Sequence, residues 1–68
     1  MKFSEKLLNL RKEKGLSQEK LAKRLNVTRQ TISKWELNQT VPDMNKLIEL
    51  SKLFKVSLDE LTRGNEYE

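Results

Sequence analysis

Hydrogen-bond donors and cations gather in one short stretch of the sequence, residues 29–36. If this stretch is a helix turning about 100° per residue, Ile32, Trp35 and Glu36 share one inward arc. The side chains that project away from that arc are Arg29, Gln30, Ser33 and Lys34. Arg and Lys can donate to guanine N7 and O6, and Gln can pair with adenine N6 and N7. The stretch therefore has the chemistry needed to read a DNA major groove, although exposed helix faces are commonly polar in any protein.

The absence of cysteine and histidine removes most catalytic and metal-binding chemistry. Without them the chain has no disulfide, thiol nucleophile, near-neutral imidazole base, or thiolate or imidazole metal ligand. The neighbouring carboxylates Asp59 and Glu60 already have a role beside Ser57, where they favour the start of a helix. We therefore expect neither an enzyme nor a bound cofactor or metal.

Length and composition describe one small domain. The chain has 68 residues, of which 35% are hydrophobic and 35% charged. No apolar run exceeds two residues, so we expect no membrane span or signal peptide and a cytoplasmic protein. Residues 1–42 carry ten Lys and Arg against four Glu, whereas residues 43–68 carry four against six acidic residues. A basic first part suits a polyanionic partner, although a net charge of +4 also occurs in helical proteins that bind none.

Capping residues and apolar periodicity predict five helices and no strand. Ser4, Ser17, Thr28 and Ser57 are suitable caps, and the fourth helix is entered through Pro42 and Asp43. The expected spans are about 4–14, 18–25, 29–36, 43–54, and a short helix from Ser57 that ends before Gly64. Only two residues separate the second and third helices, so these should cross at a steep angle. We expect an all-α domain over residues 1–64 and a frayed tail over 65–68.

A series of motifs also runs along residues 3–61. It comprises Leu7-x-x-Leu10-Arg11, Lys14-Gly15-Leu16-Ser17-Gln18-x-x-Leu21-Ala22, Leu25-x-Val27-Thr28-x-x-x-Ile32-Ser33-x-Trp35-Glu36, Pro42, Leu50, and Val56-Ser57-Leu58-Asp59-Glu60-Leu61. This series resembles the phage-repressor-like Xre/Cro-type helix-turn-helix family. The resemblance implies a compact, lambda-repressor-like five-helix bundle whose second and third helices form the helix-turn-helix. It also implies a sequence-specific transcriptional regulator, expected to be a repressor, that inserts the third helix into the major groove of a double-stranded DNA operator.

The resemblance assigns roles to individual residues. It implies base contacts by Arg29, Gln30, Ser33 and Lys34. It implies phosphate contacts by Gln18, Thr28, Asn38, Gln39 and Thr40, through the cap hydroxyl and loop N–H groups. Simple turn chemistry is the alternative interpretation of the loop. Arg11 and Glu36 resemble the internal ion pair of the family, which should be structural, and Trp35 should lie in the core.

The chain departs from the family where glycine is common. Asn26, Asn38 and Lys55 occupy such positions. Asn accepts a left-handed backbone reasonably well, whereas Lys accepts it less well. The turn at Lys55 should therefore either adopt another geometry or carry strain of about 1 kcal/mol.

A homodimer on an inverted-repeat operator is expected, because one recognition helix touches too few base pairs for tight specific binding. The apolar residues left after the core stripes predict a dimer patch away from DNA: Leu8, Ile48, Leu53 and Leu58. Scattered exposed leucines are, however, ordinary. The alternative function is an antitoxin-like or other protein-interaction module with an unidentified protein partner. Such a module should carry apolar or acidic side chains at positions 30, 33 and 34. This chain instead has the polar or cationic side chains of Gln30, Ser33 and Lys34 there.

Overall fold

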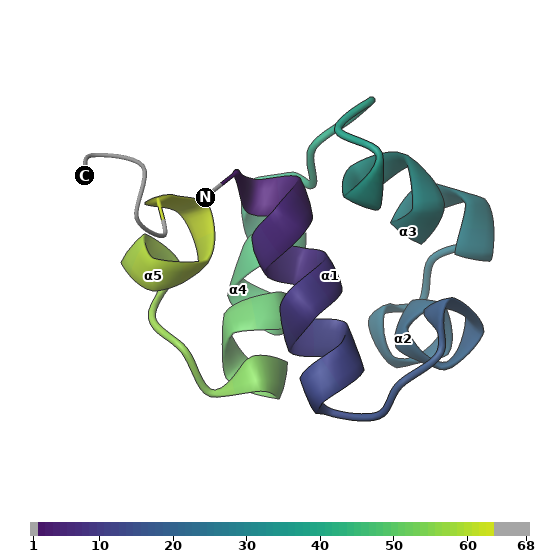
Figure 1. Cartoon of the computed structure of the whole chain (residues 1–68), viewed down its shortest axis with the longest axis horizontal. Helices are drawn as coiled ribbons and strands as arrows, with labels where there is room; N and C mark the ends of the chain where they lie inside the picture. Colours follow the sequence, from purple (N-terminus) through teal and green to yellow (C-terminus); the bar gives the residue numbers. More distant parts are fainter. Residues whose placement is uncertain (1, 64–68) are drawn as a thin grey trace.

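Five α-helices form the secondary structure of residues 2–63, the part of the chain that the computed structural model describes. They are α1 (Phe3–Glu13), α2 (Gln18–Leu25), α3 (Arg29–Glu36), α4 (Met44–Phe54) and α5 (Leu58–Arg63), as Figure 1 shows. The all-α prediction is confirmed, and α2 and α3 have the predicted bounds. Within this range no helix has the length and apolar character needed to cross a membrane. The predicted stop at Gly64 and the tail over 65–68 lie outside the described residues.

The first helix begins earlier than the sequence predicts. Ser4 is not its cap: Lys2 has the cap position, and the Lys2 N–H donates to the Glu5 carboxylate at 3.2 Å. Ser4 lies inside the first turn and is buried. An earlier start places Phe3 four residues before Leu7 on one face of the helix, where Phe3 packs against the core. The earlier start thus goes together with two contacts, the Lys2–Glu5 hydrogen bond and the packing of the partly buried Phe3 side chain.

The predicted caps Ser17, Thr28 and Ser57 are confirmed, and Asp43, predicted as the first residue of the fourth helix, is instead the cap of α4. Each side chain accepts a hydrogen bond from the amide three residues later: Ser17 from Lys20 at 3.0 Å, Thr28 from Thr31 at 3.2 Å, Asp43 from Lys46 at 2.9 Å and Ser57 from Glu60 at 2.9 Å. A cap of this kind contributes about 1 kcal/mol. Helices of six to eight residues are unstable in isolation, so α2, α3 and α5 depend on these caps and on tertiary packing.

One apolar cluster, to which every helix contributes, forms the core. Its members are Leu7, Leu21, Ala22, Leu25, Ile32, Trp35, Leu50, Phe54 and Leu61. Trp35 is 4% exposed, which confirms its predicted place in the interior. Because both buried side chains of α3, Ile32 and Trp35, point into this cluster, the opposite face of α3 is left for solvent.

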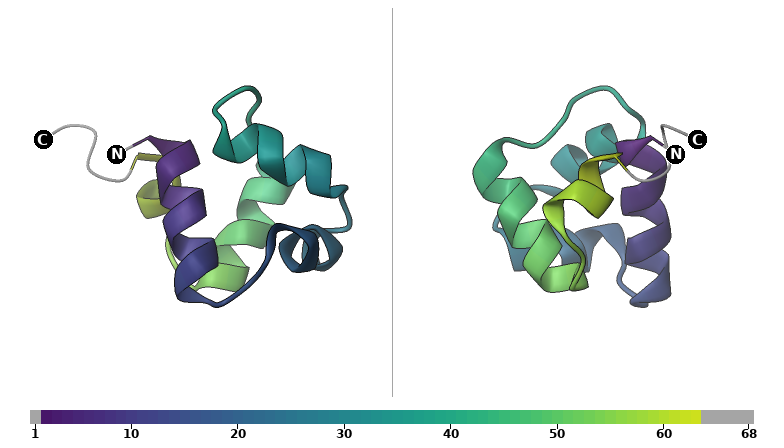
Figure 2. Two further views of the ribbon diagram at one scale, coloured as in Figure 1. Left: turned by 45° about the vertical axis from the view of Figure 1, so that its right-hand side comes forward. Right: turned by 90° about the vertical axis from the view of Figure 1, so that its left-hand side faces the viewer.

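The turn between α2 and α3 is tight. Asn26 adopts a left-handed backbone with φ of 60°, and the Val27 amide donates to the Ala22 carbonyl at 3.0 Å. The left-hand view of Figure 2 shows α2 almost end-on while α3 runs across the view, which confirms the predicted steep crossing. Lys46 on α4 donates its Nζ to the Leu25 carbonyl at 2.7 Å. That contact supplies a partner to a carbonyl at the end of α2 and fixes the helix pair against α4.

Lys55 forms the turn between α4 and α5 in the strained conformation. Its φ is 58°, in the left-handed region, and the Val56 amide donates to the Ser51 carbonyl at 3.0 Å. The chain reverses here at the bottom of the right-hand view in Figure 2. Of the two outcomes expected for Lys55, the strained left-handed turn is therefore the one that occurs.

Candidate nucleic-acid interface

The outer face of α3 presents the predicted base-contacting residues together. Arg29, Gln30 and Lys34 are exposed, and Ser33 is half-buried. The opposite face is anchored by buried side chains, so the helix cannot rotate without breaking the core. Within the described part of the chain, the side chains of Gln30 and Lys34 make no hydrogen bond or ion pair. Their donors and acceptors are therefore free for a ligand.

The N-terminal end of α3 is strongly electropositive. Arg29 is the first residue of the helix, and no acidic residue lies in its first turn. The N-terminus of a helix already carries a partial positive charge, so a cation at this position disfavours the helix rather than stabilising it. The position of Arg29 therefore lowers the stability of α3, but it favours the binding of an electronegative ligand.

Arg11 and Glu36 meet in a largely buried ion pair. Arg11 Nε lies 2.6 Å from Glu36 Oε2, and Nη2 lies 3.2 Å from Oε1. Their side chains are 12% and 5% exposed. Arg11 Nη1 also donates to the Leu16 carbonyl at 2.9 Å. The pair thus joins α1, the loop before α2 and the last residue of α3.

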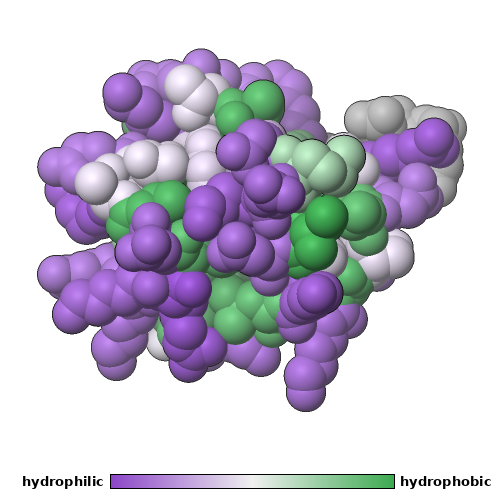
Figure 3. Space-filling view, turned by 180° about the vertical axis from the view of Figure 1, so that it is seen from behind, coloured by the Kyte–Doolittle hydropathy of each residue, from purple (hydrophilic) through white to green (hydrophobic). Residues whose placement is uncertain are grey.

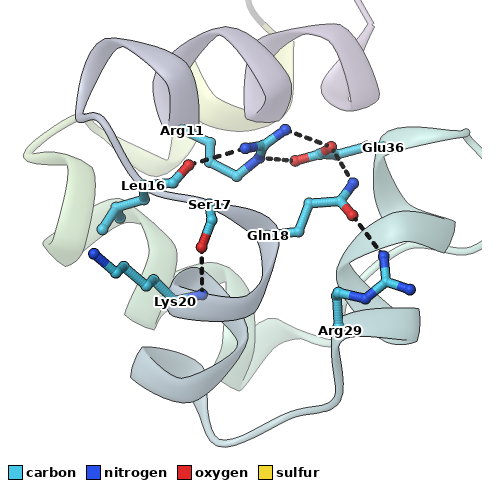
Figure 4. A network of polar contacts seen from close by, with 7 residues as sticks. All are labelled: Arg11, Leu16, Ser17, Gln18, Lys20, Arg29 and Glu36. Carbon is cyan, nitrogen blue, oxygen red and sulfur yellow. Dashed lines mark hydrogen bonds and ion pairs between the residues drawn. The ribbon is translucent and has the colours of Figure 1, made fainter.

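Gln18 extends this network from the interior to the tip of α3. Its Nε2 donates to Glu36 Oε1 at 2.9 Å, and its Oε1 accepts from Arg29 Nη1 at 3.2 Å (Figure 4). Gln18 is half-buried, whereas Arg29 is exposed. The family resemblance implies a phosphate contact for Gln18, and nothing in the sequence predicts its contact with Arg29. Gln18 and Arg29 lie on different helices, so only the crossing of α2 and α3 reveals the contact.

The remaining predicted phosphate-contacting residues lie at the two ends of α3. Thr28 caps the helix, and its hydroxyl lies 3.0 Å from that of Thr31. The amides of Asn38, Gln39 and Thr40 donate to α3 carbonyls at 3.2, 2.9 and 3.4 Å. Turn hydrogen bonds thus already occupy the loop N–H groups that were predicted to contact phosphate. The three side chains are exposed and remain the groups through which this loop could contact a phosphate.

A basic surface on α2 adds to the positive charge. Lys20, Lys23 and Arg24, with Leu16, line an open hollow of about 270 Å³. Among residues 2–63, none of these cations lies in an ion pair with a carboxylate. These cations were not among the predicted site residues, although spacings of three and four residues on a predicted helix indicate a shared face. In Figure 4, the Lys20 side chain points away from Arg29.

The predicted dimer patch is only partly exposed. Leu58 is 36% exposed, while Leu8, Ile48 and Leu53 are half-buried. Figure 3, in which α4 is nearest the viewer, shows apolar areas divided by polar side chains. The most exposed apolar side chains follow α3 instead: Leu37 (64%), Val41 (71%) and Met44 (60%). The sequence does not reveal them as a group, because they belong to no common helical stripe.

Comparison with known proteins matches residues 7–61 to the helix-turn-helix family. The chain is 50% identical over 66 residues to the HTH-type transcriptional activator BcrR of Enterococcus faecalis, covering 97% of this chain and 32% of that protein. It is 41% identical to the HTH-type transcriptional regulator YqaE of Bacillus subtilis, covering 97% of this chain and 57% of that protein. The chain thus spans 32% to 57% of the length of these relatives.

Two solved structures share the fold over nearly the whole chain. The P22 c2 repressor in complex with synthetic operator 9T superposes with a TM-score of 0.89 and 32% identity, covering 96% of this chain and 98% of that one. A transcriptional regulator from Listeria innocua superposes with a TM-score of 0.86 and 41% identity, covering 90% of this chain and 57% of that one. The helix-turn-helix architecture implied by the sequence resemblance is confirmed.

Proposed function

This chain belongs to the helix-turn-helix family, and on that premise we propose that it is a sequence-specific double-stranded DNA-binding transcriptional regulator. The observation that carries the proposal is the outer face of α3, where Arg29, Gln30 and Lys34 are exposed on a helix fixed to the core from behind. The likeness to the P22 c2 repressor, solved with a synthetic operator, supports it.

In the proposed complex α3 enters the major groove. A helix with its side chains is about 10–12 Å in diameter, so α3 fits a groove about 12 Å wide. Arg29 and Lys34 donate to guanine, Gln30 pairs with adenine, and Ser33 contacts either base. Phosphate contacts on either side of this face fix the position of the domain along the DNA. The residues proposed to make them are Gln18, Thr28, Asn38, Gln39 and Thr40. The proposed function requires no cofactor and no catalytic step. The protein is proposed to act in the cytoplasm.

Binding as a homodimer to an inverted repeat follows from the geometry of the duplex. Two recognition helices must lie about 34 Å apart to enter successive major grooves on one side of DNA. The expected regulatory effect is repression, in which the bound dimer blocks access to the promoter. A protein-interaction module on the same scaffold is the second candidate function, favoured by the exposed apolar side chains of Leu37, Val41 and Met44.

Selection from a random DNA pool at near-physiological salt, followed by sequencing, tests the proposal. We expect enrichment of an inverted repeat with half-sites one helical turn apart, and affinity for it that falls with salt. Recovery of no motif, with only weak salt-sensitive binding, would favour the protein-interaction module. Replacing Arg29 and Lys34 together by Ala should abolish the enrichment. The charge-matched control replaces Lys12 and Lys52, which are exposed in the last turns of α1 and α4, away from α3 in Figure 1.

A further inference from the structure

Three cationic side chains of α2 line an open hollow that the proposed DNA contacts do not use. Lys20, Lys23 and Arg24 form this α2 hollow together with Leu16, and its volume is about 270 Å³. The three cations are exposed, whereas Leu16 is half-buried and packs against the core. The α2 hollow therefore combines three positive charges with an apolar surface that the core holds in place.

The charges of the α2 hollow are not neutralised by the domain itself. Within residues 2–63, the side chains of Lys20, Lys23 and Arg24 make no ion pair and no hydrogen bond. Glu19 is the one acidic residue of α2, and it lies in none of the ion pairs of this part of the chain. Like charges three and four residues apart on a helix repel each other. The three cations are therefore free to meet an external anion.

Helix stability explains only two of these cations. Lys23 and Arg24 lie in the last turn of α2, where a positive charge interacts favourably with the helix dipole. Lys20 lies in the first turn, at the positive end of the dipole, where a cation is unfavourable. Its position thus lowers the stability of α2, but it completes the group of cations around Leu16.

The size and lining of the α2 hollow indicate what could occupy it. Pockets for small molecules usually measure about 300–1,000 Å³ and enclose most of their ligand, so an open hollow of about 270 Å³ suits a side chain of a larger partner better. Clusters of Arg and Lys recognise acidic motifs of peptides. Leu16 adds apolar surface, which can cover an apolar side chain. The matching occupant is a peptide segment that carries several carboxylates around one large apolar side chain.

The same features distinguish this occupant from DNA. In Figure 4 the side chain of Lys20 points away from Arg29, which begins the helix that is proposed to enter the major groove. A DNA phosphate could pair with the cations, but it brings no apolar side chain to Leu16. The observations therefore favour a protein partner at the α2 hollow.

We propose that the α2 hollow is a docking site for an acidic segment of a partner protein. Carboxylates of the segment pair with Lys20, Lys23 and Arg24, and its apolar side chain covers Leu16. The proposal goes beyond DNA binding and does not depend on it. Exposed ion pairs are individually weak and are screened by salt, so the docking is salt-sensitive.

Selection from a library of random linear peptides, displayed on phage and captured by the wild-type chain, tests the proposal. We expect enrichment of peptides with several Asp or Glu residues around one large apolar residue. A synthetic, fluorescently labelled copy of the most enriched peptide is then titrated by anisotropy at near-physiological salt. Combining Lys20→Gln, Lys23→Gln and Arg24→Gln should weaken its binding about tenfold or more, as expected for the loss of three exposed ion pairs.

Two controls separate docking at this place from general attraction to a basic protein. Combining Lys12→Gln, Lys52→Gln and Lys55→Gln removes the same charge from exposed positions outside the hollow, and should change the affinity less than about twofold because salt screens distant charges. Replacing the apolar side chain of the peptide by serine should weaken binding about fivefold or more. This second change leaves the fold of the protein untouched, and thermal melting establishes that both triple variants are folded.

An excess of duplex DNA provides the last measurement, in which the labelled peptide should stay bound. Displacement of the peptide by DNA would assign the three cations to the DNA interface and overturn the proposal. Selection that enriches no acidic peptide overturns it as well. So does an equal loss of affinity in the two triple variants, or a peptide whose apolar side chain can be removed without effect.

Discussion

The guanidinium of Arg11 makes two hydrogen bonds to the carboxylate of Glu36, at 2.6 and 3.2 Å, with both side chains largely withdrawn from water. The contact joins α1 to the last residue of α3. The direction of the recognition helix therefore depends on the first helix of the domain as well as on its turn from α2.

Arg11→Ala should unfold the domain before it affects any DNA contact. The substitution leaves a buried carboxylate without its cation, at a cost of about 3–5 kcal/mol. That cost approaches the whole free energy of unfolding of a small domain, about 5 kcal/mol. Urea denaturation followed by circular dichroism measures it. Arg63→Ala removes the exposed pair with Asp59 and should cost no more than about 0.5 kcal/mol. Equal effects of the two substitutions would show that burial does not govern the Arg11 pair.

Gln30→Ala should relax sequence preference with little loss of non-specific affinity. Gln30 is exposed on the outer face of α3, where its amide can contact a base edge, and that contact discriminates by about 1–3 kcal/mol. Gln39→Ala, on the loop after α3, should weaken binding to all sequences about equally. Fluorescence anisotropy with matched and scrambled sites at two salt concentrations separates the two effects. If the variants behave alike, the division into base and phosphate contacts is wrong.

Lys55→Gly should stabilise the domain. Lys55 has a φ of 58°, a conformation that costs a residue with a Cβ about 1 kcal/mol and costs glycine nothing comparable. A gain of that size corresponds to about 4–8 °C in Tm for a domain of this length. Lys14→Gly is the matched control, because Lys14 ends α1 with a φ of −84° and should lose stability on the same substitution. A lower Tm for Lys55→Gly would mean that the lysine side chain contributes more than the strain costs.

Charges introduced at Ile48 and Leu58 should prevent two copies from binding one operator. Lysine at both positions places two cations in each copy of the predicted dimer patch, where they would repel across a two-fold interface. Sedimentation of the DNA complex measures the stoichiometry. Val41→Lys with Met44→Lys provides the comparison, because these side chains are the more exposed apolar groups after α3. Unchanged sedimentation of the first double variant would rule out the predicted patch, and a change in the second alone would move the interface to this connection.

Local sequence patterns correctly predicted the helix caps that depend on only a few neighbouring residues. The caps at Ser17 and Thr28 are correct because the hydroxyl and the amide that it satisfies are three residues apart. Ser4 was predicted as a cap in the same way and is not one, because α1 begins one residue earlier than predicted, with Phe3 packed against the core and Lys2 bonded to Glu5. A cap can specify a boundary only where packing does not require a different one.

Contacts between helices were harder to predict. Periodicity alone identified the outer face of α3, including Gln30 and Lys34. The contact of Gln18 with Arg29 spans eleven positions and depends on how α2 crosses α3. The bonded amides of Asn38 and Gln39 depend likewise on the path of the chain after the helix. A sequence pattern shows which groups could donate, but not which of them the fold has already paired.

The unequal support of the α3 side chains has a consequence for the evolution of operator choice. Among the described residues, the side chains of Gln30 and Lys34 make no hydrogen bond or ion pair. We therefore expect that a single mutation at either position can change the preferred base without disturbing the domain. A mutation of Arg29 instead leaves the Gln18 carbonyl without its donor. New preferences at the base pair that Arg29 is proposed to contact should therefore arise through paired changes at both positions, and redesign of the protein for a new operator should vary the two together.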